Sequence, residues 1–312
     1  MRTDGLGVAV VSGGGRGIGR AVALSLAAAG HPVCVNDTGV GLDGRDPNPA
    51  ASQSVAEEIS AGGGTAMASV IDARTSAAAR RLVAEVEAWS GQAPTVLVHA
   101  AGTLRDGMIH KSTDEDWAEV MGAHLGVAVE LTRALAGGLR AGRTGRIVYV
   151  GGAAGLVGNV GQAAYVVAKA GLVGLTRAVA LEMASLDVCV NYVAPFAFTR
   201  MTESIPPVTE ALASYLASAR LATAADVAPL VVWLCSPDAA GITGQVWGAR
   251  GAEVTIWSQA SPAASFVEPQ GWRPASLETQ LRPRAQPHFA PLQSEFDLFG
   301  SPPVPVERQP VR

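Results

Sequence analysis

The stretch that decides the fold reads Ser12-Gly13-Gly14-Gly15-Arg16-Gly17-Ile18-Gly19. It follows a short apolar run at residues 7–11 and leads into an Ala- and Leu-rich segment with helical spacing at residues 18–29. A turn from a strand into the N-terminus of a helix presents unpaired backbone N–H groups and the positive end of the helix dipole. Such a turn suits a pyrophosphate, so the sequence predicts a dinucleotide-binding site here.

The same alternation continues from residue 7 to about residue 257. Most of the short runs are Val-rich and apolar on both faces, as expected of strands covered on both sides. They lie at residues 7–11, 32–36, 65–71, 94–100, 146–150, 188–194 and 245–247. Segments with helical spacing lie at residues 18–29, 50–61, 76–90, 114–139, 163–185 and 224–235. This order predicts an α/β fold: a Rossmann-type, doubly wound sheet of about seven mainly parallel strands flanked by helices, forming one domain over residues 1–257.

Residues 258–312 differ in composition, because they hold ten of the 19 prolines of the chain. That density argues against regular helix and central strand and predicts an extended C-terminal tail. Two interpretations stay open: a disordered tail, or a tail that wraps over the domain or a neighbouring subunit. The candidate anchors are aromatic: Trp272, Phe289, Phe296 and Phe299.

Composition excludes several classes of protein. The 312 residues carry a net charge of −4, with 48% hydrophobic and 16% charged residues, against about 25% charged in ordinary domains. General disorder, coiled coil and collagen are excluded, and the basic surplus expected of a nucleic-acid binder is missing. No run of 18 uninterrupted apolar residues is present, so we expect no membrane partner. The first five residues show no cleavable leader pattern.

The cysteines and histidines predict no disulfide and no metal site. Cys34, Cys189 and Cys235 are odd in number, widely spaced and embedded in apolar segments, which is typical of buried thiols in a reducing cytoplasm. We therefore expect a cytoplasmic protein. The five histidines show no ligand spacing.

An acidic residue follows the second predicted strand. Asp37 comes 18 residues after Gly19, close to the spacing of the acid that binds the adenosine ribose in dinucleotide-binding folds. Its carboxylate favours NAD over NADP because it would repel a 2′-phosphate, whereas Arg16 would attract one. The alternative is that Asp37 is an ordinary turn residue before Thr38 and Gly39.

A phenol and an ammonium lie four residues apart in Tyr165-Val166-Val167-Ala168-Lys169. At the start of a helix this spacing places both side chains on one face. We expect the ammonium to lower the pKa of the tyrosine, which makes Tyr165 an acid/base candidate for a hydroxyl–carbonyl exchange.

Together, the glycine turn, His99-Ala100-Ala101-Gly102 and Tyr165-x-x-x-Lys169 resemble the short-chain dehydrogenase/reductase family over residues 7 to about 257. Val35-Asn36-Asp37, the segment at residues 104–109 and the segment at residues 194–202 are similar to the 3-hydroxyacyl-CoA dehydrogenase units of multifunctional enzymes and their bacterial relatives.

The resemblance implies roles for individual residues. Tyr165 would be the acid/base and Lys169 would bind the ribose, while Asp72 would bind the adenine and Thr199 or Thr202 would lie near the nicotinamide amide. The implied cofactor contacts are Ser12, Gly13, Gly15, Arg16, Gly17, Ile18, Gly19, Asp37, Asp72, Ala73, Ala100, Ala101, Gly102, Tyr165, Lys169, Pro195, Thr199 and Met201.

Two positions depart from the family pattern. A serine is expected 13 residues before the tyrosine, but the sequence there reads Gly151-Gly152, so the hydroxyl that would hold the substrate oxygen is missing. The usual asparagine of the fourth helix aligns with His124, as in related hydroxyacyl-CoA enzymes. Asn159 and Gln162 are candidate replacement donors; alternatively, they make only loop hydrogen bonds, the substrate supplies the donor, or the glycines make room for a bulky ring.

These observations predict a cytoplasmic NAD(H)-dependent oxidoreductase of the ketoreductase or hydroxyacyl dehydrogenase type. The substrate would be a small molecule or an acyl thioester, and the composition suggests bacterial secondary metabolism. The alternatives are a dehydratase, cyclase or rearranging enzyme on the same scaffold, and a catalytically silent subunit of a hetero-oligomer. The resemblance also implies a homodimer or homotetramer through the helices at residues 114–139 and 163–185.

Overall fold

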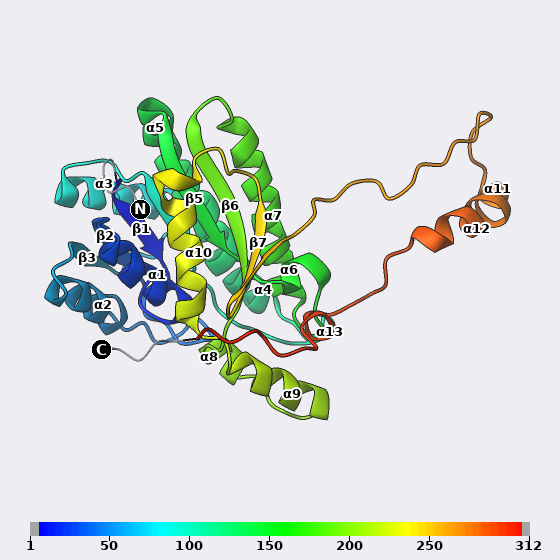
Figure 1. Cartoon of the computed structure of the whole chain (residues 1–312), viewed down its shortest axis with the longest axis horizontal. Helices are drawn as coiled ribbons and strands as arrows, with labels where there is room; N and C mark the ends of the chain where they lie inside the picture. The colour runs from blue at the N-terminus through cyan, green and yellow to red at the C-terminus, as the bar shows by residue number, and fades with distance from the viewer. Residues whose placement is uncertain (1–5, 308–312) are drawn as a thin grey trace.

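The structure, a computed structural model, describes residues 6–307. Residues 1–5 and 308–312 lie outside the described residues. The expectation about a cleavable leader falls on the first of these ranges, and the outer ends of the predicted domain and of the predicted tail fall within the two ranges as well. Within the described part, a central sheet of eight strands has the order β3-β2-β1-β4-β5-β6-β7-β8. Figure 1 shows this sheet with helices packed around it and a long C-terminal arm that leaves the domain and returns to it.

The α/β prediction is confirmed, and each of the seven predicted strands is found. The strands are β1 (Ala9–Ser12), β2 (Val33–Asn36), β3 (Ala66–Ser69), β4 (Val96–His99), β5 (Thr144–Val150), β6 (Asp187–Phe196), β7 (Val246–Arg250) and β8 (Glu253–Ile256). Strands β1 to β7 pair in parallel. The sequence prediction missed β8, which pairs antiparallel with β7 at the sheet edge. It follows β7 through a two-residue turn with Gly251 at a φ of +58°.

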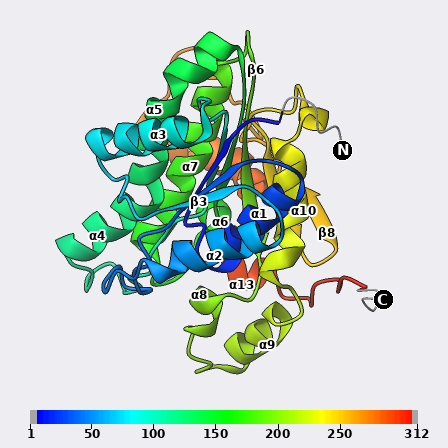
Figure 2. The same cartoon turned by 90° about the vertical axis from the view of Figure 1, so that its left-hand side faces the viewer.

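Helices cover both faces of the sheet, which explains the low charge content. One apolar layer lies between the sheet and α3, α5 and α7, and the other between the sheet and α1, α2 and α10; Figure 2 shows the helices on the two sides. The helices of the domain are α1 (Gly17–Ala28), α2 (Ala50–Ala61), α3 (Ser76–Ser90), α4 (Asp114–Met121), α5 (Val127–Gly142), α6 (Ala154–Val157), α7 (Ala163–Glu182), α8 (Arg200–Glu203), α9 (Glu210–Ala219) and α10 (Ala224–Cys235).

The long helix predicted at residues 114–139 is interrupted. Thr113 caps α4, because its hydroxyl accepts the Asp116 N–H at 3.2 Å while the Asp116 carboxylate accepts the Thr113 N–H at 3.0 Å. Between α4 and α5 the backbone forms a single π-helical turn, η1 (Gly122–Gly126). Such turns often occur at functional sites, and this one holds His124.

Helix α7 has the length and composition of a membrane span. Within the domain, however, it packs against α4, α6 and β6, and its Leu172 is fully buried in the core. These contacts account for its apolar character as a core helix. The three cysteines are buried and free, as predicted.

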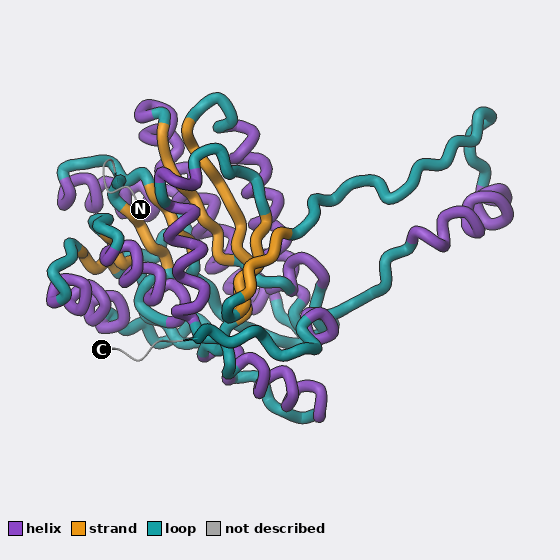
Figure 3. The backbone as a smooth tube through the Cα atoms, in the orientation of Figure 1, coloured by secondary structure: helices purple, strands orange, loops and turns teal. Residues whose placement is uncertain are grey.

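The tail is not wholly extended. Residues 274–288 form consecutive turns: α11 (Pro274–Ser276), the π-helical η3 (Leu277–Leu281), α12 (Arg282–Ala285) and the 3-10 helical η4 (Gln286–His288). The prediction against helix is therefore wrong in part, because a proline in the first turn of a helix needs no hydrogen-bonded N–H. These turns lie far out on the arm, between two long loops (Figures 1 and 3).

The end of the tail wraps back over its own domain. The short helix α13 (Glu295–Leu298) packs near α9, and the Ala252 N–H donates to the Val304 carbonyl at 2.8 Å. Phe296 and Phe299 serve as anchors, as predicted, through ring contacts with Tyr215 and Phe196. Phe289 does not, because it is 66% exposed.

Candidate active site

A cavity of about 540 Å³ opens at the carboxyl ends of the parallel strands. It lies where the chain order of the sheet reverses between β1 and β4, the position at which such sheets bind ligands. All the candidate catalytic and cofactor-binding residues line this cavity: Ser12, Gly13, Gly15, Arg16, Gly17, Ile18, Gly19, Asp37, Asp72, Ala73, Ala100, Ala101, Gly102, His124, Gly152, Tyr165, Lys169, Pro195, Thr199, Met201 and Thr202.

The glycine turn forms a close-fitting cradle. Gly13 has a φ of +75°, and a Cβ there would lie 2.5 Å from the Ala101 nitrogen. A Cβ on Gly19 would lie 2.0 Å from the Gly13 carbonyl oxygen. Helix α1 begins directly after this turn, and its N-cap residue, Arg16, makes no capping hydrogen bond through its side chain. The backbone N–H groups of the first turn are therefore not capped by that residue, and the cradle fits a pyrophosphate.

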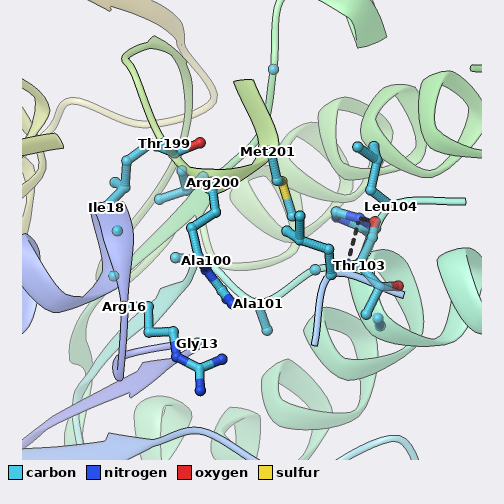
Figure 4. A pocket seen from close by; sticks show the side chains of 18 of the residues that line it. Gly13, Arg16, Ile18, Ala100, Ala101, Thr103, Leu104, Thr199, Arg200 and Met201 are labelled. Carbon is cyan, nitrogen blue, oxygen red and sulfur yellow. Dashed lines mark hydrogen bonds between the residues drawn. The ribbon is translucent and has the colours of Figure 1, made fainter. Parts of the chain in front are cut away.

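Charged side chains gather beside the turn. The two carboxylate oxygens of Asp37 accept the Gly15 N–H at 2.9 Å and the Gly39 N–H at 2.7 Å. Arg16 projects from the turn and Arg200 from α8 (Figure 4). Burial and the charge of Arg16 lower the pKa of Arg200, while Asp37 opposes them. This end of the cavity thus holds one carboxylate and two guanidinium groups.

Asp72, the expected adenine contact, forms an ion pair with Arg74. Asp72 accepts the Arg74 N–H at 3.2 Å, and its carboxylate lies 3.3 Å from Arg74 Nε. Ala73 is buried beside it. These positions form the wall of the cavity beyond β3.

The predicted catalytic pair lies on one face of α7. Lys169 Nζ donates a hydrogen bond to the Val150 carbonyl at 3.0 Å and lies 5.5 Å from the centre of the Tyr165 ring. Burial lowers the pKa of Lys169 to about 7.

The expectation that Lys169 lowers the pKa of Tyr165 is not met. Burial raises the pKa of Tyr165 well above its ordinary value, and the nearby carboxylates of Glu295 and Asp106 raise it further. The desolvation of both groups outweighs their mutual effect. Tyr165 therefore holds its proton at neutral pH.

His124 packs against Tyr165. Its Nε2 donates to the Thr103 carbonyl at 2.8 Å, and its ring meets the Tyr165 ring edge-on at 5.1 Å. Gly102 leaves room for this ring, since a Cβ there would lie 2.0 Å from His124 Cε1. Burial and the charge of Lys169 hold the pKa of His124 well below its ordinary value, so the imidazole is neutral.

Comparison with known proteins supports the assignment of the fold. The family model described as enoyl-(acyl carrier protein) reductase matches residues 13–251. A short-chain dehydrogenase from Mycobacterium avium has a solved structure that matches with a TM-score of 0.78 and 36% identity over 96% of this chain and 97% of its own. The chain belongs to the short-chain dehydrogenase/reductase family.

Two curated relatives are themselves reductases. A 3-oxoacyl-(acyl-carrier-protein) reductase of Pseudomonas aeruginosa is 35% identical over 76% of this chain and 93% of its own length. An acetoacetyl-CoA reductase of Rhizobium meliloti is 35% identical over 79% of this chain and 98% of its own length. The mouse peroxisomal multifunctional enzyme type 2 is 37% identical over 75% of this chain but only 30% of its own length. This chain is accordingly a short-chain dehydrogenase/reductase oxidoreductase.

Against that family background, Tyr192 explains the glycine pair. A Cβ on Gly151 would lie 1.9 Å from Tyr192 Cζ, so the tyrosine ring fills the space of a side chain there. The Tyr192 hydroxyl donates to the Gly152 carbonyl at 2.8 Å and accepts the Gly152 N–H at 2.9 Å. The sequence analysis missed this residue. A large side chain on β6 opposite two glycines after β5 was the signal that could have found it.

The two candidate donors in the loop bond to each other. Asn159 Nδ2 donates to Gln162 Oε1 at 2.9 Å, and Gln162 Nε2 donates to the Asp106 carboxylate at 2.8 Å. Both residues line the cavity. Their hydrogen bonds nevertheless agree with the alternative in which they bond within the loop and do not donate to the substrate.

Two further lining residues come from the tail. Glu295 and Phe296 line the same cavity as Tyr165 and Gly152. Glu295 was not a candidate in the sequence analysis, because more than 100 residues separate it from every catalytic motif. Tyr215 on α9 also lines the cavity.

We expect Gly152→Ser to lower activity instead of restoring it. An ideal Cβ at this position would lie 2.8 Å from the Tyr165 hydroxyl, so the new side chain must displace the phenol from its place. A displacement of this kind costs about 10- to 100-fold in rate. Steady-state kinetics and a thermal melt of the variant measure the effect, and an increase in kcat would contradict it.

Proposed function

We propose that this protein is an NAD(H)-dependent oxidoreductase that interconverts a substrate carbonyl and a hydroxyl. The observation that carries the proposal is that Tyr165, Lys169 and the glycine turn line one cavity. The bound nicotinamide would supply or accept the hydride. The reductase names of the relatives favour the direction of carbonyl reduction for this chain as well.

Each residue has a stated task in this proposal. The Tyr165 hydroxyl donates its proton to the substrate oxygen during reduction and takes it back during oxidation. Lys169 binds the nicotinamide ribose, and His124 holds the Tyr165 ring through the edge-on contact. The N–H groups of the glycine turn bind the pyrophosphate, while Asp72, Ala73 and the segment from Ala100 to Gly102 contact the adenosine side.

The proposal extends to partners and location. The substrate is a small molecule or an acyl thioester, and the protein acts in the cytoplasm as a homodimer or homotetramer. Exposed apolar side chains on α7, Val167 at 46% and Leu181 at 78%, support a contact between subunits through this helix. A role in bacterial secondary metabolism is part of the same proposal.

Hydride transfer tests the function directly. Purified protein is assayed with NADH and NADPH across a panel of ketones and 3-oxoacyl thioesters, and oxidation of the reduced cofactor is followed by absorbance. We expect turnover with at least one carbonyl. A product of unchanged oxidation state with no net use of NADH would favour dehydration, cyclisation or rearrangement. Activity only together with a co-purified homologous chain would favour a silent subunit.

The preference for NADH is expected to depend on Asp37. Its carboxylate repels a 2′-phosphate, while Arg16 and Arg200 remain nearby to attract one. Asp37→Asn should therefore lower the ratio of kcat/KM for NADH to that for NADPH by about tenfold, which corresponds to about 1.4 kcal/mol. Asp46→Asn removes an exposed carboxylate from the following loop and serves as the matched control. An unsubstituted enzyme that prefers NADPH would contradict the assignment.

A further inference from the structure

The substrate side of the cavity lacks the serine hydroxyl of the family pattern, so the substrate oxygen needs another hydrogen-bond donor besides Tyr165. Residue 152 has no side chain. The Tyr192 hydroxyl uses its proton on the Gly152 carbonyl. Asn159 and Gln162 each use one amide N–H in the hydrogen-bonded chain that ends at Asp106, and this chain fixes both side chains in the loop. Among the polar side chains that reach this side of the cavity from the tail, the Glu295 carboxyl remains.

Glu295 is held by the segment that links the two catalytic positions. Its backbone N–H donates to the Gly158 carbonyl at 3.2 Å, and its carboxyl accepts the backbone N–H of Ala154. Both partners belong to the stretch between Gly152 and Tyr165. The carboxyl is thus positioned by the same piece of backbone that sets the distance between those two residues.

Aromatic contacts fix the other side of α13. The Phe296 ring meets the Tyr215 ring at 4.7 Å, and the Phe299 ring meets the Phe196 ring at 4.8 Å. The Arg250 guanidinium lies 5.2 Å from the centre of the Phe299 ring. These contacts resist withdrawal of the tail, so the carboxyl is part of the cavity wall.

The electrostatic surroundings favour the protonated form of Glu295. Burial raises the pKa of this carboxyl to about 7. The groups that face it are the phenols of Tyr165 from α7, Tyr192 from β6 and Tyr215 from α9, whose pKa values it raises in turn. Asp106 and Lys169 also lie near Tyr165. A protonated carboxyl has one O–H to donate.

We propose that Glu295 is a catalytic residue whose protonated carboxyl donates a hydrogen bond to the substrate carbonyl oxygen beside Tyr165. This inference rests on the proposed carbonyl reduction. In that reaction the carbonyl carbon gains a hydride from the reduced nicotinamide, the oxygen gains the Tyr165 proton, and the C=O bond becomes C–OH. Glu295 keeps its own proton and stabilises the negative charge that develops on the oxygen.

Three variants separate donation from other roles. Glu295→Ala should lower kcat by about 100-fold, the usual effect of losing one such donor. Glu295→Gln keeps an N–H donor and an oxygen for the Ala154 N–H, and should stay within about tenfold of the unsubstituted enzyme. Glu307→Gln removes an exposed carboxylate from the end of the described tail and should change kcat less than about threefold. Equal losses in the Gln and Ala variants would show that the carboxylate itself is needed, which overturns the inference.

The pH profile provides a readout that a purely structural role would not change. In the unsubstituted enzyme, kcat for reduction should fall as pH rises through about 7, because the carboxyl loses the proton that it donates in the hydrogen bond. Glu295→Gln should remove one titrating group from this limb, while any contribution of Lys169, whose pKa also lies at about 7, persists. An unchanged slope in the Gln variant overturns the inference.

A measurement without turnover distinguishes failure of this inference from failure of the proposed function. Carbon-13 NMR of protein labelled at the glutamate carboxyls, with Glu295→Gln to assign the signal, should show one carboxyl titrating near pH 7. Titration at the ordinary glutamate value of about 4.3 overturns the role of Glu295 even where the enzyme is active. An unsubstituted protein that reduces no carbonyl overturns the proposed function instead.

Discussion

Tyr165→Phe is expected to lower kcat for carbonyl reduction by about 10³-fold, within the range for removal of a positioned general acid. The phenol retains its proton at neutral pH because burial raises its pKa well above the ordinary value. Phenylalanine keeps the ring and the edge-on contact with His124, so the loss falls on the chemical step. Single-turnover kinetics with bound NADH measures that step.

Tyr149→Phe is the matched control for the loss of a hydroxyl. Tyr149 is fully buried in the core, and its hydroxyl lies 2.7 Å from Thr132 Oγ1, away from the residues that line the cavity. We expect a loss of about 1 kcal/mol in the free energy of unfolding and little change in kcat. If the Tyr165 variant retained kcat within about threefold, its assignment as the acid/base would be wrong.

Gly13→Val is expected to weaken cofactor binding by about 100-fold or more. A valine would have to adopt a φ of +75° with its Cβ 2.5 Å from the Ala101 nitrogen. Strain of this kind costs about 1–3 kcal/mol before the collision is relieved, and relief moves the turn that holds the pyrophosphate. Isothermal titration with NADH gives Kd, and circular dichroism reports whether the variant is folded.

Gly137→Ala provides the control for a change at glycine. Gly137 lies on the exposed face of α5 with no atom within 4 Å of an added Cβ. Alanine there should leave Kd unchanged and raise the free energy of unfolding by up to about 1 kcal/mol, since alanine favours helix over glycine. An unchanged Kd in the Gly13 variant would show that the turn does not contact the cofactor.

The sequence predicted the strands, the main helices and the lining of the cavity because these depend on local order. A glycine turn after a buried run fixes where β1 ends, and parallel pairing then brings the ends of β2, β4 and β6 to the same edge. That geometry places three residues at the cavity: Asp37, Ala100 and Pro195. Helix periodicity similarly places Lys169 below Tyr165.

The remaining parts depend on contacts between distant segments, which no local pattern records. Tyr192 fills the space beside Gly151 from a neighbouring strand, and its hydroxyl is bound by a residue 40 positions earlier. Glu295 is held at the cavity by contacts of its tail segment with distant residues, among them Phe299 with Phe196 and Arg250. The pKa of Tyr165 was also beyond prediction, because desolvation depends on everything that surrounds the ring.

The arm between β8 and α13 keeps the segment that carries Glu295 covalently joined to the domain that it packs against. Residues 257–294 join the domain to the segment that carries Glu295, so docking of that segment is unimolecular, at an effective concentration that tethers of this kind raise to about the millimolar range. One peptide bond cut in the exposed loops of the arm would remove no residue from the cavity. It would make docking bimolecular. The activity of the cut enzyme would then fall on dilution, whereas that of the intact chain would not.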